Sequence, residues 1–203
     1  MPVVGIDLGT TYSAVAYLDE MKKPLIAPNA EGDNFTPSVV FFENRNNIVV
    51  GKEAKNSAEV YPERVVQFVK NHMGHTGKGH SWTMDGEEHE PEKISAMVLR
   101  KIKTDAETKM GKPITGAVIT VPAIFSEAAR NATREAAAIA QIEVVDILDE
   151  PVAAALSYGL APGASARKTE NVIVYDLGGG TFDLTILRIS KDEIGRASCR
   201  ERV

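Results

Sequence analysis

Two short segments, far apart in the chain, carry an aspartate, glycines and threonines in the same order. The first reads Ile6-Asp-Leu-Gly-Thr-Thr-Tyr12 and the second reads Tyr175-Asp-Leu-Gly-Gly-Gly-Thr-Phe182. A tight glycine turn lets backbone N–H groups approach an anion closely, and threonine hydroxyls can donate to phosphate oxygens. An aspartate repels phosphate but suits Mg²⁺, which prefers carboxylates, phosphates and water. The repeat therefore predicts two facing hairpins that hold a polyphosphate and its metal ion.

Other phosphate-binding motifs are missing from this sequence. It contains neither G-x-x-x-x-G-K-[ST] nor G-x-G-x-x-G, which excludes a Walker P-loop and the dinucleotide fingerprint. For either copy alone, the alternative is an ordinary hairpin with a glycine turn. Two copies with the same order of Asp, Gly and Thr favour the phosphate site.

The elements that position these segments alternate between strands and helices. Hydrophobic residues at helical spacing predict an amphipathic helix over 92–110, closed by Gly111. Ser126 is expected to cap a helix that runs to about Gln141. Further helices are expected over 53–60, over 63–70 and from Pro151 to Tyr158, and strands over 3–7, 13–18, 117–121, 144–148, 172–175 and 182–189.

This order describes an α/β lobe followed by the beginning of a second lobe. We expect residues 1–160 to form the first lobe, 161–171 a linker, and 172–193 the first hairpin of the second lobe. The last residues, 194–203, lack helical or strand periodicity and are rich in arginine. They resemble a translated sequencing adapter, so we expect a non-native tail and a natural protein that continues beyond Asp192.

The composition excludes several classes of protein. The chain has 203 residues, 43% hydrophobic and 25% charged, with a net charge of −5 and one cysteine. Such values exclude a disordered chain and a disulfide scaffold. No apolar stretch reaches the roughly 18 residues of a membrane span, and no secretory signal is evident, so we expect a cytoplasmic protein without membrane contact. The acidic balance argues against nucleic-acid binding.

Five motifs together resemble one family. They are Gly5-Ile-Asp-Leu-Gly-Thr-Thr-Tyr-Ser13, Asn34-Phe-Thr-Pro-Ser38, Val121-Pro-Ala-Ile-Phe125 with Arg130, Asp149-Glu-Pro-Val-Ala-Ala-Ala-Leu-Ser-Tyr-Gly159, and Val174-Tyr-Asp-Leu-Gly-Gly-Gly-Thr-Phe-Asp183. In this order they resemble the actin-like (ribonuclease H-like) ATPases, and among these the DnaK-type, seventy-kilodalton heat-shock chaperones. The resemblance implies a lobe with a mixed sheet flanked by helices, and ATP or ADP bound with Mg²⁺ and K⁺ between two lobes.

The resemblance also assigns roles to residues. It implies that Asp7 and Asp176 bind the metal ion through water, and that Lys70, Glu150, Asp176 and Asp183 are catalytic. Lys70 would stabilise the charge of the transferring phosphoryl group, whereas its position alone suggests only a solvated helix lysine. Pro122 and Arg130 match the family's relay between the nucleotide and a distal domain. The implied nucleotide contacts are Gly9, Thr10, Thr11, Tyr12, Gly178, Gly179, Gly180 and Thr181.

Two features depart from the family pattern. Ile124 stands where an aromatic residue is usual, which puts the relay in doubt. The segment 71–90 carries all four histidines, His72, His75, His80 and His89. A metal site is conceivable there, but the irregular spacing favours a solvated polar loop.

The function implied by the resemblance is ATP-dependent protein folding in the stress response. Its partners would be unfolded client peptides, a J-domain co-chaperone and a nucleotide exchange factor. A small-molecule kinase or a non-catalytic interaction module of the same superfold are the alternatives. Without the rest of the second lobe, Val172, Val174, Leu184, Ile186 and Leu187 would lose packing partners. We therefore expect this chain alone to aggregate and to bind ATP weakly or not at all.

Overall fold

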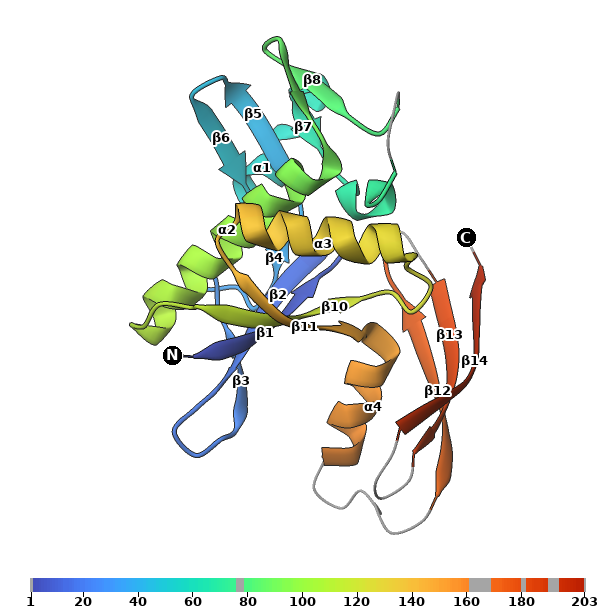
Figure 1. Ribbon diagram of the computed structural model, residues 1–203. Coiled ribbons are helices and arrows are strands. Elements are labelled where there is room, and N and C mark those ends of the chain that lie inside the picture. The colour runs from blue at the N-terminus through green and yellow to red at the C-terminus, as the bar shows by residue number, and fades with distance from the viewer. Residues whose placement is uncertain (1, 76–78, 161–168, 180–181, 190–193, 203) are drawn as a thin grey trace.

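A mixed β-sheet forms the centre of the protein (Figure 1). The computed structural model describes residues 2–75, 79–160, 169–179, 182–189 and 194–202. The strand order is β11-β10-β1-β2-β3, with β4 paired to β2. Strands β1, β10 and β11 run parallel, whereas β2 is antiparallel to β1, β3 and β4. The strands are β1 (Val3–Leu8), β2 (Tyr12–Leu18), β3 (Pro24–Ala27), β4 (Thr36–Pro37), β10 (Gly116–Val121) and β11 (Glu143–Asp149).

Helices cover both faces of this sheet. In Figure 1, α2 (Pro91–Met110) and α3 (Glu127–Ile139) lie on one face, and α4 (Glu150–Leu160) lies on the other. Gly111 ends α2 in the left-handed region, at φ 63°, as its position predicts. The Ser126 side chain accepts a hydrogen bond from the backbone N–H of Ala129, which confirms the predicted cap of α3. The fold is therefore α/β, as expected.

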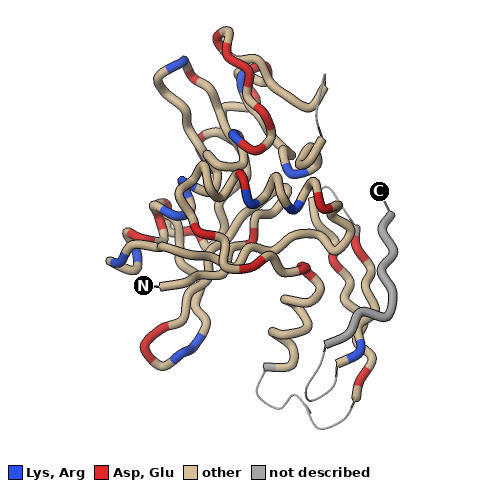
Figure 2. The backbone as a smooth tube through the Cα atoms, in the orientation of Figure 1, with Lys and Arg blue, Asp and Glu red and all other residues tan. Residues whose placement is uncertain are grey.

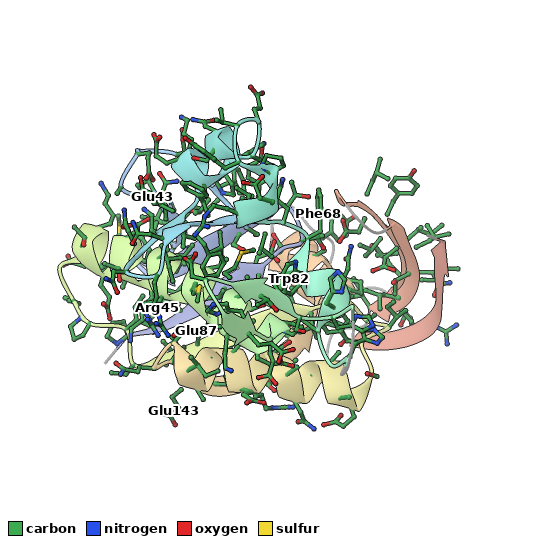
Figure 3. All side chains as sticks on the ribbon, turned by 90° about the horizontal axis from the view of Figure 1, so that it is seen from above. Glu43, Arg45, Phe68, Trp82, Glu87 and Glu143 are labelled. Carbon is green, nitrogen blue, oxygen red and sulfur yellow. The ribbon has the colours of Figure 1, made fainter. Side chains whose placement is uncertain are left out.

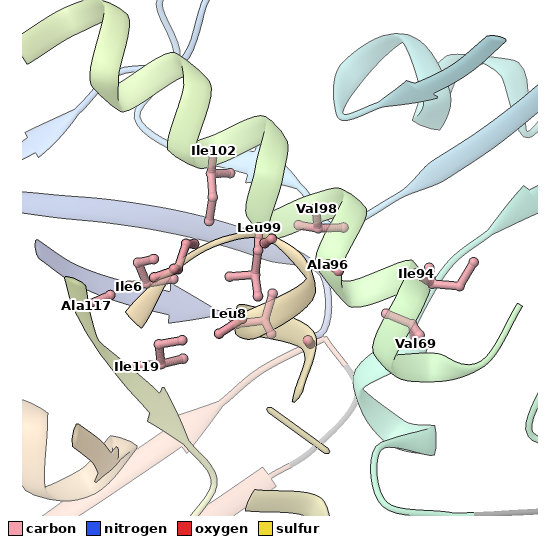
Figure 4. Close-up of a cluster of buried hydrophobic side chains, with 14 of the residues drawn as sticks. Ile6, Leu8, Val69, Ile94, Ala96, Val98, Leu99, Ile102, Ala117 and Ile119 are labelled. Carbon is pink, nitrogen blue, oxygen red and sulfur yellow. The ribbon is translucent and has the colours of Figure 1, made fainter. Parts of the chain in front are cut away.

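Strand alternation separates a core face from a polar face. Ile6 and Ile119 are register partners on neighbouring strands, and both are buried in the main hydrophobic cluster (Figure 4). Leu99 of α2 packs into the same cluster. Successive side chains of a strand point to opposite faces, so Asp7 and Thr120 lie on the other side of the sheet. The face toward α4 therefore carries the polar residues.

A second part of the structure is built on a small sheet of order β6-β5-β7. Here the predicted helix over 63–70 is wrong: the chain forms two 3₁₀ turns, Pro62–Arg64 and Val69–His72, on either side of β7. The extended pair Val65–Val66 joins β5, so sheet pairing overrides the helical spacing. The elements are β5 (Val40–Asn44), β6 (Asn47–Val50), β7 (Val65–Val66) and α1 (Lys52–Ser57), the last shorter than the helix expected over 53–60.

The histidine-bearing segment contains a hairpin rather than a polar loop throughout. Strands β8 (Trp82–Met84) and β9 (Glu87–His89) pair antiparallel. Met84 is buried, and the exposed side chains of Arg45 and Glu87 form an ion pair at 2.5 Å that links this hairpin to the β5–β6 turn (Figure 3). Each of these strands has only three residues, so the alternation of apolar and polar residues is too short to predict a strand.

A separate three-stranded sheet follows the linker. It comprises β12 (Glu170–Leu177), β13 (Phe182–Ile189) and β14 (Ile194–Arg202), all antiparallel. The segment expected to lack strand periodicity is therefore a strand, because an edge strand pairs through its backbone and needs no side-chain alternation. Residues 161–168 of the predicted linker 161–171 lie outside the described residues, and residues 170–171 belong to β12.

One face of this sheet packs against α4. Leu187 is fully buried, so the expectation that it loses its packing is wrong, whereas Val172 and Val174 are only half-buried. The register places all three on one face, because Val172 pairs with Leu187. The opposite face leaves Ile173 and Leu177 exposed by 64% and 71%.

Within the described residues, no helix combines the length and apolar character that crossing a bilayer requires.

Candidate functional site

A cavity of about 540 Å³ lies between the two glycine hairpins. The first hairpin contributes the turn between β1 and β2, and the second contributes the end of β12 and the residues after it. The wall is completed by the start of α4, by β10 and by the 3₁₀ turn Val69–His72. The lining residues are Asp7, Gly9, Thr10, Thr11, Tyr12, Lys70, Thr120, Glu150, Ala153, Ala154, Asp176, Leu177, Gly178 and Gly179.

Hydrogen bonds from a distant segment hold the first glycine turn. The Ser38 hydroxyl donates to the Gly9 carbonyl at 2.8 Å, and the Ser38 backbone N–H donates to the Thr11 carbonyl at 2.9 Å. A Cβ on Gly9 would lie 2.0 Å from the carbonyl oxygen of Tyr12, so only glycine fits this turn. Lys55 donates to the Tyr12 hydroxyl at 2.7 Å.

The two hairpins touch at Gly179. A Cβ added to Gly179 would lie 1.7 Å from the Thr11 hydroxyl oxygen, so the second turn approaches the first as closely as glycine allows. The Thr11 hydroxyl is buried and has no hydrogen-bond partner among the described residues. Gly180 and Thr181, which were also predicted as nucleotide contacts, lie outside the described residues.

Lys70 and Glu150 form a buried ion pair in this cavity. The Lys70 ammonium donates to Oε1 of Glu150 at 2.5 Å, with the two side chains 8% and 17% exposed. Phe68, which precedes the turn that carries Lys70, adopts a left-handed φ of 58° (Figure 3). Such a backbone conformation is uncommon for a bulky residue and requires support from its surroundings. From this turn Lys70 reaches Glu150, eighty residues further along the chain.

The pKa values of two carboxyl groups are perturbed here: that of Glu150, which belongs to the ion pair, and that of Asp183. Burial raises the pKa of Glu150, the charges of Asp7 and Asp176 raise it further, and Lys70 opposes the change. Burial and the charge of Asp176 likewise raise the pKa of Asp183, again against the effect of Lys70. Asp176 and Asp183 are register partners on β12 and β13, and one oxygen of Asp183 is buried with no hydrogen-bond partner in the part of the chain that the structure describes.

These residues fit a polyphosphate with a divalent cation. Three carboxylates, of Asp7, Glu150 and Asp176, line the cavity together with one ammonium group, so a cation would relieve their repulsion. Figure 2 shows acidic positions at the first turn of α4 and on the β12–β13 hairpin. Mg²⁺ is usually held by one or two carboxylates, phosphates and water. The buried Thr11 hydroxyl, which has no partner in residues 2–75, 79–160, 169–179, 182–189 and 194–202, is a donor that a phosphate oxygen would satisfy.

The predicted relay residues lie outside the cavity lining. Pro122 follows β10, and its carbonyl accepts from the Phe125 backbone N–H at 3.0 Å. Arg130 on α3 donates to Oδ1 of Asp149 at 2.6 Å and to the Phe125 carbonyl at 3.3 Å. Because Asp149 directly precedes Glu150, Arg130 is tied to the residue next to the buried ion pair. Ile124, which replaces the usual aromatic residue, is 44% exposed.

Three histidines gather at a different place. Nδ1 of His72 lies 3.0 Å from Nδ1 of His80, the ring of His75 stacks on His80, and Trp82 contacts His72 edge-on. His89 lies apart, against the ring of Phe42. In the part of the chain that the structure describes, no group of three or more His, Cys, Asp or Glu side chains is arranged to hold a metal ion.

Two residues of the site, Ser38 and Thr120, were not predicted from the sequence. Ser38 belongs to a recognised motif, but nothing local indicates that it holds the Gly9 turn. Thr120 lines the cavity, and its hydroxyl donates to Oδ1 of Asp7 at 3.1 Å. The sequence signal that could have identified Thr120 is that it is the single hydroxyl residue in the otherwise apolar run 117–121.

The fold and the cavity define a class: a mixed α/β lobe, consistent with the lobe of an actin-like ATPase, in which two glycine hairpins face each other across a polar cavity. The family model described as Hsp70 protein matches residues 3–85 and 76–195. The chain therefore belongs to the Hsp70 family. Members of this family are in general ATPases that bind ATP or ADP with Mg²⁺ and act as chaperones.

Proposed function

We propose that this chain is the N-terminal part of the ATPase domain of a DnaK-type chaperone, which hydrolyses ATP to ADP and phosphate to drive protein folding. The single observation that carries the proposal is the cavity, where both glycine hairpins meet the Lys70–Glu150 pair. Residues 1–160 are the first lobe in this proposal, 161–171 the linker, and 172–193 the first hairpin of the second lobe. Residues 194–203 are a non-native tail in this proposal, and a chaperone that carries the complete ATPase domain is called here the parent chaperone.

The remaining parts of the proposal follow from family membership. The parent chaperone binds K⁺ as well as Mg²⁺, works in the cytoplasm during stress, and acts on unfolded peptides with a J-domain co-chaperone and an exchange factor. Support comes from the family match and from the retention of Asp7, Lys70, Glu150 and Asp176 around one cavity. The same residues argue against a non-catalytic module.

The role of Lys70 is tested by single-turnover ATP hydrolysis in the parent chaperone. We expect Lys70→Ala to slow hydrolysis by about a hundredfold or more, because the charge that stabilises the transferring phosphoryl group is lost. Lys93→Ala is the matched control, since Lys93 lies on the exposed start of α2, in an ion pair with Glu90. Unchanged hydrolysis in Lys70→Ala would reject this role. Turnover that requires an added sugar or acid acceptor would favour a kinase instead.

The 203-residue chain alone is expected to bind ATP weakly. Exposed apolar residues on β12, such as Ile173 and Leu177, indicate a face built to be covered by further protein. Isothermal titration calorimetry on this chain would contradict the expectation by showing micromolar ATP binding that depends on Mg²⁺.

A further inference from the structure

Thr120 is the one polar side chain of strand β10, whose sequence is Gly-Ala-Val-Ile-Thr-Val. Its register partner on the parallel strand β1 is Asp7. Both residues therefore lie on the same face of the sheet, opposite the hydrophobic core, and both line the cavity. The strand itself does not require a hydroxyl here, because a valine has the same shape and a high preference for strands.

The hydroxyl of Thr120 contacts the carboxylate of Asp7 directly. Its Oγ1 donates to Oδ1 of Asp7 at 3.1 Å, whereas the carbonyl oxygen of Ile6, at 3.5 Å, is a much poorer acceptor. Threonine is branched at Cβ and has few side-chain conformations, and the parallel pairing fixes the spacing of the two strands. The donor is thus held in place before any ligand arrives. A donor on one carboxylate oxygen also leaves the second oxygen for another partner.

We propose that Thr120 is a positioning residue for the metal-bearing side of the nucleotide site. Its hydroxyl holds the Asp7 carboxylate in one orientation, so that the carboxylate can accept hydrogen bonds from water molecules around Mg²⁺. This inference rests on the proposed function, in which Asp7 is the carboxylate that the first hairpin contributes to the metal. Residues that orient metal-binding carboxylates typically change metal affinity by about 10- to 100-fold when they are replaced.

The test compares two substitutions that differ in the hydroxyl. Thr120→Val keeps the shape and removes the donor, whereas Thr120→Ser keeps the donor and removes a methyl group. ADP affinity is measured by equilibrium titration in the parent chaperone, with and without free Mg²⁺. Thr108→Val is the matched control, because the Thr108 hydroxyl is exposed on α2 and donates only to the Thr104 carbonyl among the bonds of the structure.

We expect Thr120→Val to lose about 10- to 100-fold of the Mg²⁺-dependent gain in ADP affinity and to keep its metal-free affinity. Thr120→Ser should keep most of the gain, and Thr108→Val all of it. A Thr120→Val protein with the full Mg²⁺ response would overturn the inference. Equal loss of metal-free affinity in the Val and Ser variants would also overturn it, because that result indicates a packing role. Failure of the unsubstituted protein to bind ADP would instead overturn the proposed function, and this inference with it.

Discussion

Replacement of Lys70 by methionine is expected to destabilise the protein by an amount that depends on pH. Methionine retains an apolar chain of similar length and removes only the charge that Glu150 contacts at 2.5 Å. The carboxylate would then be left in a largely buried position without its cation. The neighbouring carboxylates of Asp7 and Asp176 would make this worse, because both already raise the pKa of Glu150.

The expected size of the effect follows from the burial of the pair. Removal of one partner from a buried ion pair costs about 3–5 kcal/mol. Since the Glu150 side chain retains 17% exposure, we expect the lower end of that range, about 3 kcal/mol in the free energy of unfolding near pH 8. Glu150 can avoid part of this cost by binding a proton. That protonation itself costs about 1.4 kcal/mol for each unit by which the pH exceeds the pKa of Glu150.

The sign of the pH dependence follows from the raised pKa of Glu150. Burial is the main cause of the increase, and Lys70 opposes it, so the pKa should rise further in Lys70→Met. A carboxyl group whose pKa is raised in the folded state contributes stability below its unfolded value, and this contribution is lost as the pH rises through the folded value. The destabilisation should therefore be smaller near pH 5 than near pH 8.

The assay is urea unfolding of the 203-residue chain at both pH values, at a protein concentration low enough to avoid the aggregation expected of this chain. Unfolding is followed by the fluorescence of its single tryptophan, Trp82. Trp82 packs against the main hydrophobic cluster and reports on the first lobe. Glu150→Gln and the double variant complete a double-mutant cycle, in which the double variant should recover much of the stability, because neither charge remains. Lys93→Met is the control. A loss that is equal at both pH values, or additive in the cycle, would refute this reasoning.

Two further predictions concern the hairpin contact and the histidine cluster. Gly179→Ala should weaken ADP binding by the parent chaperone about tenfold, because the new Cβ would lie 1.7 Å from the Thr11 hydroxyl oxygen. Gly159→Ala is the control, because a Cβ there meets no atom within 4 Å. Equal ADP affinities of the two variants would contradict the predicted clash. The pKa of His72 is lowered by burial and then by His80, so the folded state resists protonation and stability should fall as the pH drops below about 6.5. Thermal unfolding of His72→Gln should show a weaker decline on the acid side, and an identical pH profile would argue against this assignment.

Local features of the sequence determined the hairpins and the main helices. Both glycine turns lie between runs that form strands, and the long helix ending at Gly111 and the cap at Ser126 follow from residue preferences within a few positions. The histidine hairpin and the extended Val65–Val66 segment were not predictable in this way. Val65–Val66 is held as a strand by β5, more than twenty positions earlier in the chain, whereas the strands of the histidine hairpin pair only with each other and are too short for their local pattern to indicate pairing.

The sequence alone also supplied the residue types of the candidate site, through the repeated Asp-Leu-Gly segments and the family motifs. Only the tertiary structure decided which of them meet. Lys70 reaches Glu150, eighty positions further along the chain. Thr120 reaches Asp7 through the register of two parallel strands, and Gly179 touches Thr11 where the two hairpins converge. Such contacts depend on how sheets and helices pack over long separations in the chain, whereas periodicity and turn chemistry describe only neighbouring residues.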